Sequence, residues 1–265
     1  PIFILTLNMG TAGAAIATVL GNILACVFYL GFFLTKKSTL SIHPRYFLSG
    51  LDVARRLITI GLPAGINSAL MSVATILLNN SLVSYGDKPL AAMGIVTKAY
   101  MLIVFIHMGI TNGIQPLLGY CYGANNKKRF ISIMKFSGML TLISGTVLSA
   151  IYIIFSRPVV TLFINDTEVI GYGAQMLIAT SLAGPILGLL FLSINSMQAM
   201  DCPVPATLLS ICRQGLFFIP LLYILKAGFG LQGINYTQTI SDYLAIVISL
   251  LLLRRSLRKF KGDPS

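Results

Sequence analysis

Long blocks of apolar residues, separated by short polar joints, make up most of this chain. A helix needs about 20 mostly apolar residues to cross a hydrocarbon core about 30 Å thick. Seven blocks are long enough, and we expect each to form a transmembrane helix: residues 10–34, 57–83, 89–122, 129–156, 170–199, 206–226 and 231–253. The pattern therefore predicts an all-α, polytopic membrane bundle. The third block exceeds a perpendicular crossing, so we expect it to tilt or bend, with Pro116 as the obvious place for a distortion.

The composition also indicates a bilayer. The chain is 56% hydrophobic and 10% charged, with a mean hydropathy of +0.86, whereas soluble domains are about 45–50% apolar and about 25% charged. So few charged residues cannot cover the surface of a soluble protein of 265 residues. The four cysteines lie far apart without a CxxC spacing, so they indicate neither a zinc site nor a disulfide framework.

The basic residues set the expected orientation. If residues 35–56 are cytoplasmic, 14 of the 19 Lys and Arg residues fall on the cytoplasmic side, three on the opposite side and two inside spans. This asymmetry follows the positive-inside rule and predicts a cytoplasmic C-terminus. The net charge of +12 is thus explained by membrane topology. We expect no nucleic-acid partner, because the basic residues form no face interleaved with aromatics.

Two glycine-containing segments suggest an internal repeat. Residues 10–22 can be aligned with residues 230–242 so that two glycines match. If the first and last helices are equivalent parts of two tandem halves, five helices that should precede residue 1 are missing. We therefore expect an N-terminally truncated chain with four parts: the last helix of an N-terminal lobe (1–34), a cytoplasmic linker (35–56), a six-helix C-terminal lobe (57–255) and a basic cytoplasmic tail (256–265).

The sequence gives little support to an enzyme. Its two histidines, His43 and His107, fall in different regions and do not form a metal cluster or a catalytic triad. The chain has neither a P-loop nor a GxGxxG motif after a strand. We therefore expect no catalytic residues, no metal site and no cofactor apart from a coupling ion.

Polar residues inside the predicted spans are the main functional candidates, because such residues are expensive in lipid. On the span 57–83, a polar stripe about 60° wide comprises Ser68, Ser72, Thr75 and Asn79. The next span carries a second polar set on one broad face: His107, Thr111, Asn112 and Gln115. Close helix packing with local hydroxyl hydrogen bonds would explain the first stripe. A shared water-filled cavity would explain both, and two adjacent polar faces favour it.

Three charged residues lie near the middle of their predicted spans: Lys98, Arg213 and Asp242. An unpaired charge in hydrocarbon costs at least about 2.5–3.5 kcal/mol. We therefore predict that Asp242 pairs with Arg213 or Lys98. Such a pair is either a permanent structural lock or a group that titrates or senses substrate.

Three ordered stretches carry a family resemblance. They are GLPAGINSALMSVATILLNNSLVSYG, LAAMGIVTKAYMLIVFIHMGITNGIQPLLGYCYGANNKKR, and RQGLFFIPLLYIL with GFGLQGINYTQTISD after it. Together they closely resemble the C-terminal half of multidrug and toxin extrusion (MATE) transporters, nearest to the bacterial MepA-like and DinF-like branch. The resemblance covers nearly the whole chain. Such proteins have twelve helices in two six-helix bundles, which agrees with the expected truncation.

The resemblance implies a secondary efflux antiporter of the cell (inner or plasma) membrane that exports cationic or amphipathic compounds in exchange for H⁺ or Na⁺. Its partners would be small-molecule drugs and organic cations, the lipid bilayer and the missing N-terminal lobe. Related NorM-type transporters carry a cation-binding glutamate on the helix equivalent to 57–83, where Met71 stands in this sequence. In the DinF-like branch the coupling aspartate is on the first helix, which this chain lacks. The coupling carboxylate is therefore expected in the absent lobe.

The polar residues and the resemblance together give the candidate substrate cavity: Asn67, Ser72, Asn79, His107, Gln115, Asn195 and Gln198. Apolar and aromatic contacts with a few polar groups would make a loose site that accepts many compounds. Two other functions stay open. One is a flippase for lipid-linked saccharides of the wider superfamily, which a strongly cationic cavity would favour. The other is a truncated membrane protein that does not transport.

Overall fold

The computed structural model describes residues 9–34, 51–201 and 203–260, and every regular element in these ranges is a helix. The chain divides into two compact units, residues 1–58 and 59–265. The first unit contains α1, Gly10–Leu34, which covers the first predicted span. Helix α2, Leu51–Val83, begins in the first unit and continues into the second.

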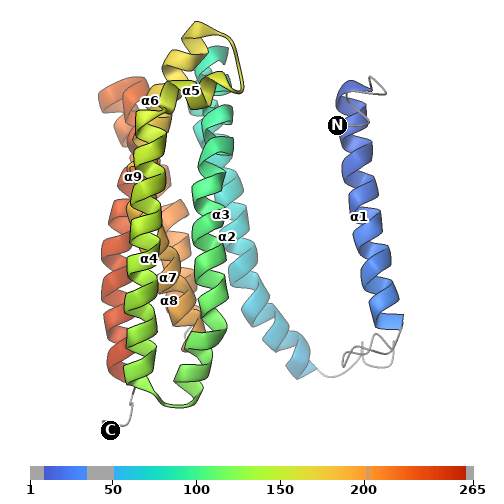
Figure 1. Ribbon diagram of the computed structural model, residues 1–265, viewed down its shortest axis with the longest axis vertical. Helices are drawn as coiled ribbons and strands as arrows, with labels where there is room; N and C mark the ends of the chain where they lie inside the picture. Colours follow the sequence, from blue (N-terminus) through green and yellow to red (C-terminus); the bar gives the residue numbers. More distant parts are fainter. Residues whose placement is uncertain (1–8, 35–50, 202, 261–265) are drawn as a thin grey trace. The chain divides into compact units, whose positions relative to one another are not determined.

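The second unit is a bundle of helices, called the lobe below (Figure 1). After α2 its elements are α3 (Asp87–Gly123), α4 (Lys127–Ile154), α5 (Ser156–Thr161), α6 (Thr167–Ser181), α7 (Gly184–Ala199), α8 (Pro203–Ile211), the π-helix η3 (Cys212–Phe218) and α9 (Ile219–Lys259). Helix α7 is central, because it contacts α3, α4, α8 and α9. Helix α3 also packs against α4 and α6. The lobe is therefore built around α3 and α7.

Helices α6 and α7 form one bent crossing over the predicted span 170–199. Their axes differ by 47° across a short break. Gly184 and Pro185 begin α7, and a proline is well tolerated at the first turn of a helix because its missing N–H would be unpaired there anyway. The break in this crossing therefore coincides with the glycine and proline that begin α7.

Helix α9 contains a sharp reversal at Gly230. This glycine has φ 59° and ψ −133°, which lies outside helical values. A Cβ on Gly233 would collide with the carbonyl oxygen of Leu225, and Ser241 Oγ donates a hydrogen bond of 2.7 Å to the carbonyl of Arg213. Residues before and after Gly230 therefore run antiparallel, as two arms of a helical hairpin. The spans predicted at 206–226 and 231–253 are these two arms.

The membrane-crossing elements correspond to the sequence pattern. By length and apolar composition, four described segments are long enough to cross a bilayer, and the bent α6–α7 pair adds a fifth. One of the four, Val204–Arg258, contains the hairpin and supplies two crossings. Within its described residues α2 contributes the shorter apolar segment Ser68–Val83. The predicted all-α polytopic bundle is confirmed.

Helix α3 is continuous through Pro116. It runs for 37 residues from Asp87 to Gly123, or about 55 Å at 1.5 Å per residue. Proline has no N–H to donate, so the helix lacks the hydrogen bond that residue 116 would give to the carbonyl of Asn112. The proline therefore weakens α3 at one turn without ending the helix.

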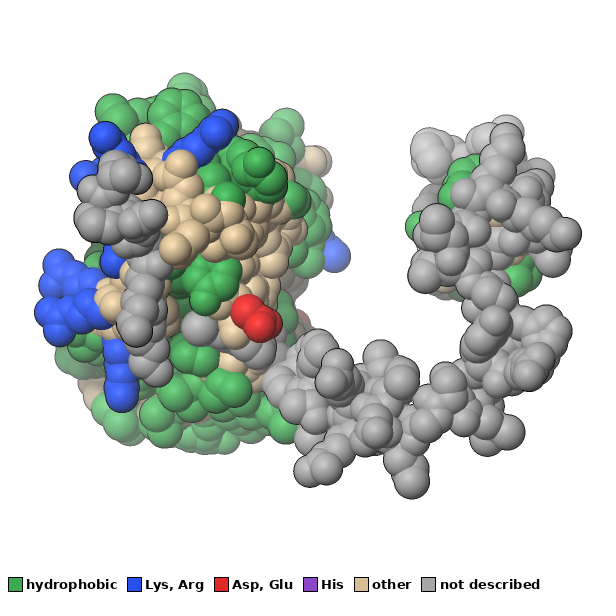
Figure 2. Space-filling view, turned by 90° about the horizontal axis from the view of Figure 1, so that it is seen from below, with side chains coloured by type: hydrophobic (Ala, Val, Ile, Leu, Met, Phe, Trp, Pro, Cys, Tyr) green, Lys and Arg blue, Asp and Glu red, His purple; other side chains and the backbone are tan. Residues whose placement is uncertain are grey.

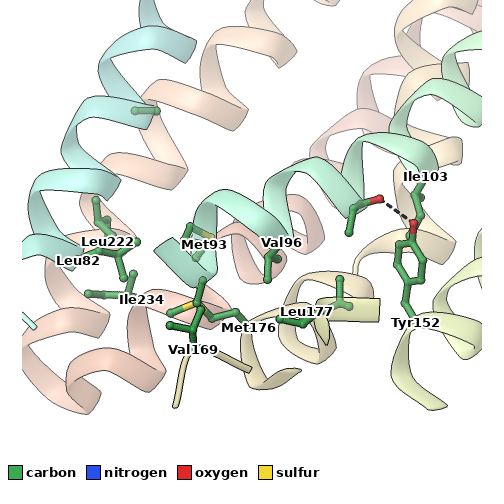
Figure 3. Packing of buried hydrophobic residues seen from close by; sticks show 14 of the residues in the cluster. Leu82, Met93, Val96, Ile103, Tyr152, Val169, Met176, Leu177, Leu222 and Ile234 are labelled. Carbon is green, nitrogen blue, oxygen red and sulfur yellow. Dashed lines mark hydrogen bonds between the residues drawn. The ribbon is translucent and has the colours of Figure 1, made fainter. Parts of the chain in front are cut away.

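Buried apolar side chains form two clusters toward the two ends of the lobe. The first joins α2, α3, α6 and α9 through residues such as Leu82, Met93 and Met176, as Figure 3 shows. In the same cluster the Tyr152 hydroxyl donates a 2.7 Å hydrogen bond to the carbonyl of Ala99. The bond satisfies the polar end of a buried ring, so tyrosine is stable there.

The second cluster joins the end of α9 to the turn between α3 and α4. Its members include Leu118, Leu190 and Phe130. The ring of Phe260 lies 5.6 Å from that of Phe130, and Lys127 Nζ donates a hydrogen bond of 2.7 Å to the carbonyl of Phe260. This contact brings the last turn of α9 to the same level as the first turn of α4.

Glycines allow α4 and α7 to approach closely. A Cβ on Gly145 would lie 2.5 Å from the carbonyl oxygen of Gly184, and a Cβ on Gly188 would lie 2.5 Å from the imidazole of His107 and from Cβ of Thr141. Real Cβ atoms do not occur at such distances, so a larger residue would push the helices apart. Small residues at helix interfaces are typical of membrane bundles.

Candidate transport surface and buried charge pair

Four amide side chains link α3 to α7 on the surface of the lobe. Asn195 Nδ2 donates to Asn112 Oδ1 at 3.0 Å. One turn farther along both helices, Gln115 Nε2 donates to Gln198 Oε1 at 3.3 Å. Both bonds are exposed. We call these four residues the amide ladder, and each amide keeps free hydrogen-bonding capacity.

The amide ladder adjoins the turn of α3 that Pro116 weakens. Asn112 is the residue whose backbone carbonyl lacks its usual partner, and its side chain forms the first rung. The ladder therefore ties α3 to α7 at the turn where α3 has one hydrogen bond fewer. Asn112 was placed on the polar face by helical spacing but was not among the cavity candidates.

Lys98 lies on the same exposed face of α3 as Asn112. The two residues are fourteen positions apart, which returns to within about 40° of the same direction at 3.6 residues per turn, and both side chains are exposed. Lys98 takes no part in the two ion pairs seen in the described residues. A lysine facing acyl chains near mid-span costs at least about 2.5–3.5 kcal/mol. This face of α3 is therefore suited to water rather than to lipid.

The polar stripe on α2 is exposed and partly satisfied by its own helix. Ser72 Oγ donates to the carbonyl of Ser68 at 3.1 Å, and Thr75 Oγ1 donates to the carbonyl of Met71 at 2.9 Å. Such bonds let hydroxyls sit in an apolar setting without a cavity. Asn79 is exposed as well. The side chain of Asn67, another candidate, lies outside the described residues.

His107 is not on the lobe surface, which corrects its place among the cavity candidates. Its side chain is buried, and Nε2 lies 3.1 Å from the carbonyl oxygen of Thr141. Thr111 is also buried and donates to the carbonyl of His107 at 2.9 Å. Helical spacing grouped these residues with Asn112 and Gln115. The packing of α4 and α7 on α3 covers one half of that face and leaves the other half exposed.

Asp242 pairs with Arg213, as expected from their depth. Arg213 Nε lies 2.6 Å from Asp242 Oδ1, and Nη2 lies 3.4 Å from Oδ2, so the guanidinium contacts both carboxylate oxygens. Gln238 Nε2 donates a third hydrogen bond to Oδ1 at 2.9 Å. The exposed fractions of the two side chains are 15% for Arg213 and 1% for Asp242. Buried charges persist only when paired and hydrogen-bonded in this way.

The buried pair joins the two arms of the helical hairpin. Arg213 belongs to the π-helix η3, and Asp242 to the returning arm of α9. The guanidinium carbon also lies 5.8 Å from the ring centroid of Phe191 on α7, within cation–π range. Gln238 lies four residues before Asp242 on the same helix, so helical spacing could have found it, whereas Phe191 of α7 gave no signal in the sequence.

Basic side chains gather at the end of the lobe where α3 meets α4 and where α9 finishes. Figure 2 shows Lys and Arg around the rim of this end, with acidic side chains at one point. The basic residues of these turns with described, exposed side chains are Lys128, Arg129, Lys135, Arg254, Arg255 and Arg258. The opposite end holds an exposed ion pair, Lys88 Nζ to Glu168 Oε2 at 2.6 Å.

The described residues hold no group of three or more His, Cys, Asp or Glu side chains that could bind a metal ion. The amide ladder and the buried pair are two polar clusters that join different helices of the lobe through side chains. An all-helical lobe with a bent crossing, a helical hairpin and close glycine contacts defines the class of polytopic α-helical membrane proteins.

The chain belongs to the MatE family, whose sequence profile matches residues 63–224. The chain is 27% identical over 252 residues to the multidrug export protein MepA of Staphylococcus saprophyticus, covering 95% of this chain and 55% of the relative. It therefore spans about half the length of that relative. The MATE resemblance seen in the sequence is confirmed, and family membership agrees with the expectation of a transporter rather than an enzyme.

Two solved structures share the fold. An outward-facing MATE transporter of the MOP superfamily aligns with a TM-score of 0.83 at 21% identity, covering 98% of this chain and 59% of the other. A MOP superfamily transporter from Pyrococcus furiosus, described as having a binding pocket of reversed polarity, also gives 0.83 at 21% identity, covering 99% and 60%. At this identity the likeness concerns the fold alone.

Proposed function

We propose that this chain supplies one lobe of a multidrug exporter that moves cationic or amphipathic compounds out of the cell in exchange for H⁺ or Na⁺. The second lobe would come from the part of the protein that corresponds to the remaining length of the MepA relatives. The observation that carries the proposal is the exposed polar face of α3, with Lys98 and the amide ladder, in a chain related to a multidrug export protein.

The polar face suits a loose substrate site. Amide groups donate and accept hydrogen bonds without a fixed charge, so the ladder would orient a polar group of a substrate while apolar neighbours hold its body. Exposed apolar residues stand on the same side of α3, such as Leu102 and Phe105. Asn79 and Ser72 on α2 would extend the polar wall. A pocket with few polar groups and adaptable apolar contacts accepts many compounds.

Neutral amides also favour drug export over saccharide transfer. A flippase for lipid-linked saccharides would need cations for the phosphate groups of its substrate. The exposed face of α3 described above offers one lysine, and the charge of Arg213 is neutralised by Asp242.

We propose further that Asp242 does not carry the coupling ion. Its carboxylate accepts two hydrogen bonds at Oδ1 and a longer one at Oδ2 and is 1% exposed, so a proton or Na⁺ would have to enter a buried site and compete with the guanidinium of Arg213. Met71 stands where a carboxylate could have faced the pathway. The coupling carboxylate would then belong to the other lobe.

The proposed orientation puts the basic end of the lobe in the cytoplasm. Cytoplasmic loops of membrane proteins carry an excess of Lys and Arg, and the α3–α4 turn and the end of α9 both do so. The C-terminus would thus be cytoplasmic.

A dye-efflux experiment tests the proposed function. The complete protein is reconstituted into vesicles loaded with a fluorescent organic cation, and H⁺ and Na⁺ gradients are imposed separately. We expect one gradient to drive dye movement and the other to have no effect. Dye movement under neither gradient, from protein that is folded by circular dichroism, would end the antiporter proposal.

A further inference from the structure

An apolar groove on the lobe runs between α4, α7 and α9 and has one cation in its wall. Its volume is about 380 Å³, which falls in the range of about 300–1,000 Å³ for small-molecule sites. The residues that shape it include Met134, Lys135, Gly138, Leu189, Leu192 and Leu253. Gly138 has no side chain and so leaves space beside Leu189. A Cβ at position 138 would lie 3.4 Å from the Leu189 side chain, an ordinary van der Waals contact. Lys135 is the charged residue of this lining.

Lys135 lies near the basic end of the groove. It is eight residues into α4, about 12 Å from the first residue of the helix. The bond from Lys127 to Phe260 sets the last turns of α9 beside the first turns of α4. The exposed Arg254 and Arg258 of α9 therefore lie toward the same end as Lys135. Neither ion pair of the described residues involves Lys135, so its ammonium is free to bind an anion.

We propose that this groove binds an anionic phospholipid from the membrane leaflet that surrounds the basic end of the lobe. One acyl chain would lie in the groove, and the headgroup phosphate would contact Lys135. A lysine bends its aliphatic stem along an apolar wall and reaches the headgroup level with its charge. Basic pockets between transmembrane helices bind anionic lipid headgroups by this arrangement. The proposal needs the membrane location of the lobe and does not rest on the transport activity.

A second apolar groove provides an internal comparison. It lies between α3 and α4 and has a volume of about 580 Å³. Its lining consists mainly of apolar residues, such as Ile114, Leu117 and Phe136, together with two serines. No charged residue is among its lining residues. An acyl chain gains nothing by leaving the bilayer for an equally apolar groove. Headgroup selectivity should therefore belong to the groove with Lys135.

Native mass spectrometry of the complete protein in detergent measures this binding directly. The protein is titrated with phosphatidylglycerol or with phosphatidylcholine of the same chains, and the dissociation constant of the first bound lipid is determined. We expect phosphatidylglycerol to bind at least about fivefold more tightly. The variant Lys135→Gln should lose about fivefold in phosphatidylglycerol affinity, the equivalent of about 1 kcal/mol per cation. Its phosphatidylcholine affinity should fall less, because choline already balances the charge of that phosphate.

The matched control is Arg129→Gln. Arg129 is an exposed cation on the same helix but points about 120° away from Lys135 around the helix axis, so its removal should leave both affinities unchanged. Equal loss in the two variants, or equal binding of the two lipids to the unaltered protein, would overturn the proposal. Protein dimers that exclude phosphatidylglycerol would also overturn it, because a second copy would then cover the groove. A circular dichroism spectrum equal to that of the unaltered protein shows that each variant is folded.

Discussion

The buried pair of Arg213 and Asp242 makes a strong prediction about stability. Replacing Asp242 by Asn leaves the guanidinium without its counter-charge at a site where the aspartate is 1% exposed. Removing one partner of a buried ion pair costs about 3–5 kcal/mol. The loss here should lie within that range, because the carboxylate accepts two bonds from Arg213 and one from Gln238. Asp242→Asn, Asp242→Leu and Arg213→Met should each lower the free energy of unfolding by this amount, and Asp242→Leu and Arg213→Met are the single variants of the double variant below.

Replacing both partners should restore much of the stability. Apolar residues of similar size avoid the cost of removing two charges from water, and such exchanges are neutral or stabilising by about 1–4 kcal/mol in other proteins. The double variant Arg213→Met with Asp242→Leu should therefore be more stable than either single variant. The two single effects would then be far from additive.

Equilibrium unfolding of the complete protein in mixed micelles, followed by circular dichroism, measures these differences. Lys88→Gln is the matched control, because it removes an ion pair whose side chains are 46% and 67% exposed, and exposed pairs contribute about 0–1 kcal/mol. A double variant as unstable as the sum of the two single variants would refute the structural-lock interpretation. Loss of gradient-driven dye efflux in a folded double variant would refute the proposal that Asp242 takes no part in coupling.

Three further predictions follow from local contacts. Gly188→Ala should lower the free energy of unfolding by about 1–3 kcal/mol, because its Cβ would lie 2.5 Å from two side-chain atoms. The control is Gly109→Ala, whose Cβ meets no atom within 4 Å and which should be neutral or stabilising. The same unfolding assay compares the two variants. Asn195→Ala removes an exposed ladder bond and one polar group of the proposed pathway. It should weaken dye transport about fivefold, as loss of one hydrogen bond of about 1 kcal/mol to the substrate would do, and should lower the free energy of unfolding by no more than about 1 kcal/mol. Asp166 caps the N-terminus of α6, and the hydrogen bond from the N–H of Val169 holds its pKa below the usual value. The cap should therefore stabilise α6 above about pH 4 and lose this effect as the pH falls further. Hydrogen exchange of α6 should show the loss, and Asp166→Asn should abolish the pH dependence.

The helices were predictable from the sequence because lipid requires long apolar blocks and closed backbone hydrogen bonding. Helix α1 begins and ends at the predicted residues, 10 and 34. The reversal at Gly230 was also visible as a polar joint, although the structure places it inside a single helix element of 41 residues. Gly184 and Pro185 permit the break between α6 and α7, but they are equally compatible with an unbroken span, and the apolar block is continuous from 170 to 199.

The side-chain partners were less predictable. Depth along the helices was enough to suggest Arg213 as a partner of Asp242, because opposite charges at similar depth in the membrane can form an ion pair that lowers the cost of burying both. Depth could not separate Lys98 from Arg213, because the choice depends on which helices are neighbours. Helical spacing likewise put His107 and Asn112 on one face. Only the packing of α4 and α7 shows that one residue is covered and the other exposed.

The contacts inside the lobe support the placement of the proposed transport residues on its surface. Close glycine contacts join α4 to α7, and the buried ion pair joins η3 to α9. Packed interfaces of this kind have discrete arrangements and do not slide continuously, so we infer that the lobe moves as one body against its partner lobe, as in alternating access by rocking. Under the proposed function, a substrate would pass over the exposed face of α3, where Lys98 and the amide ladder lie. Substitutions inside the lobe should therefore change stability, whereas substitutions on this face should change transport and leave stability nearly intact.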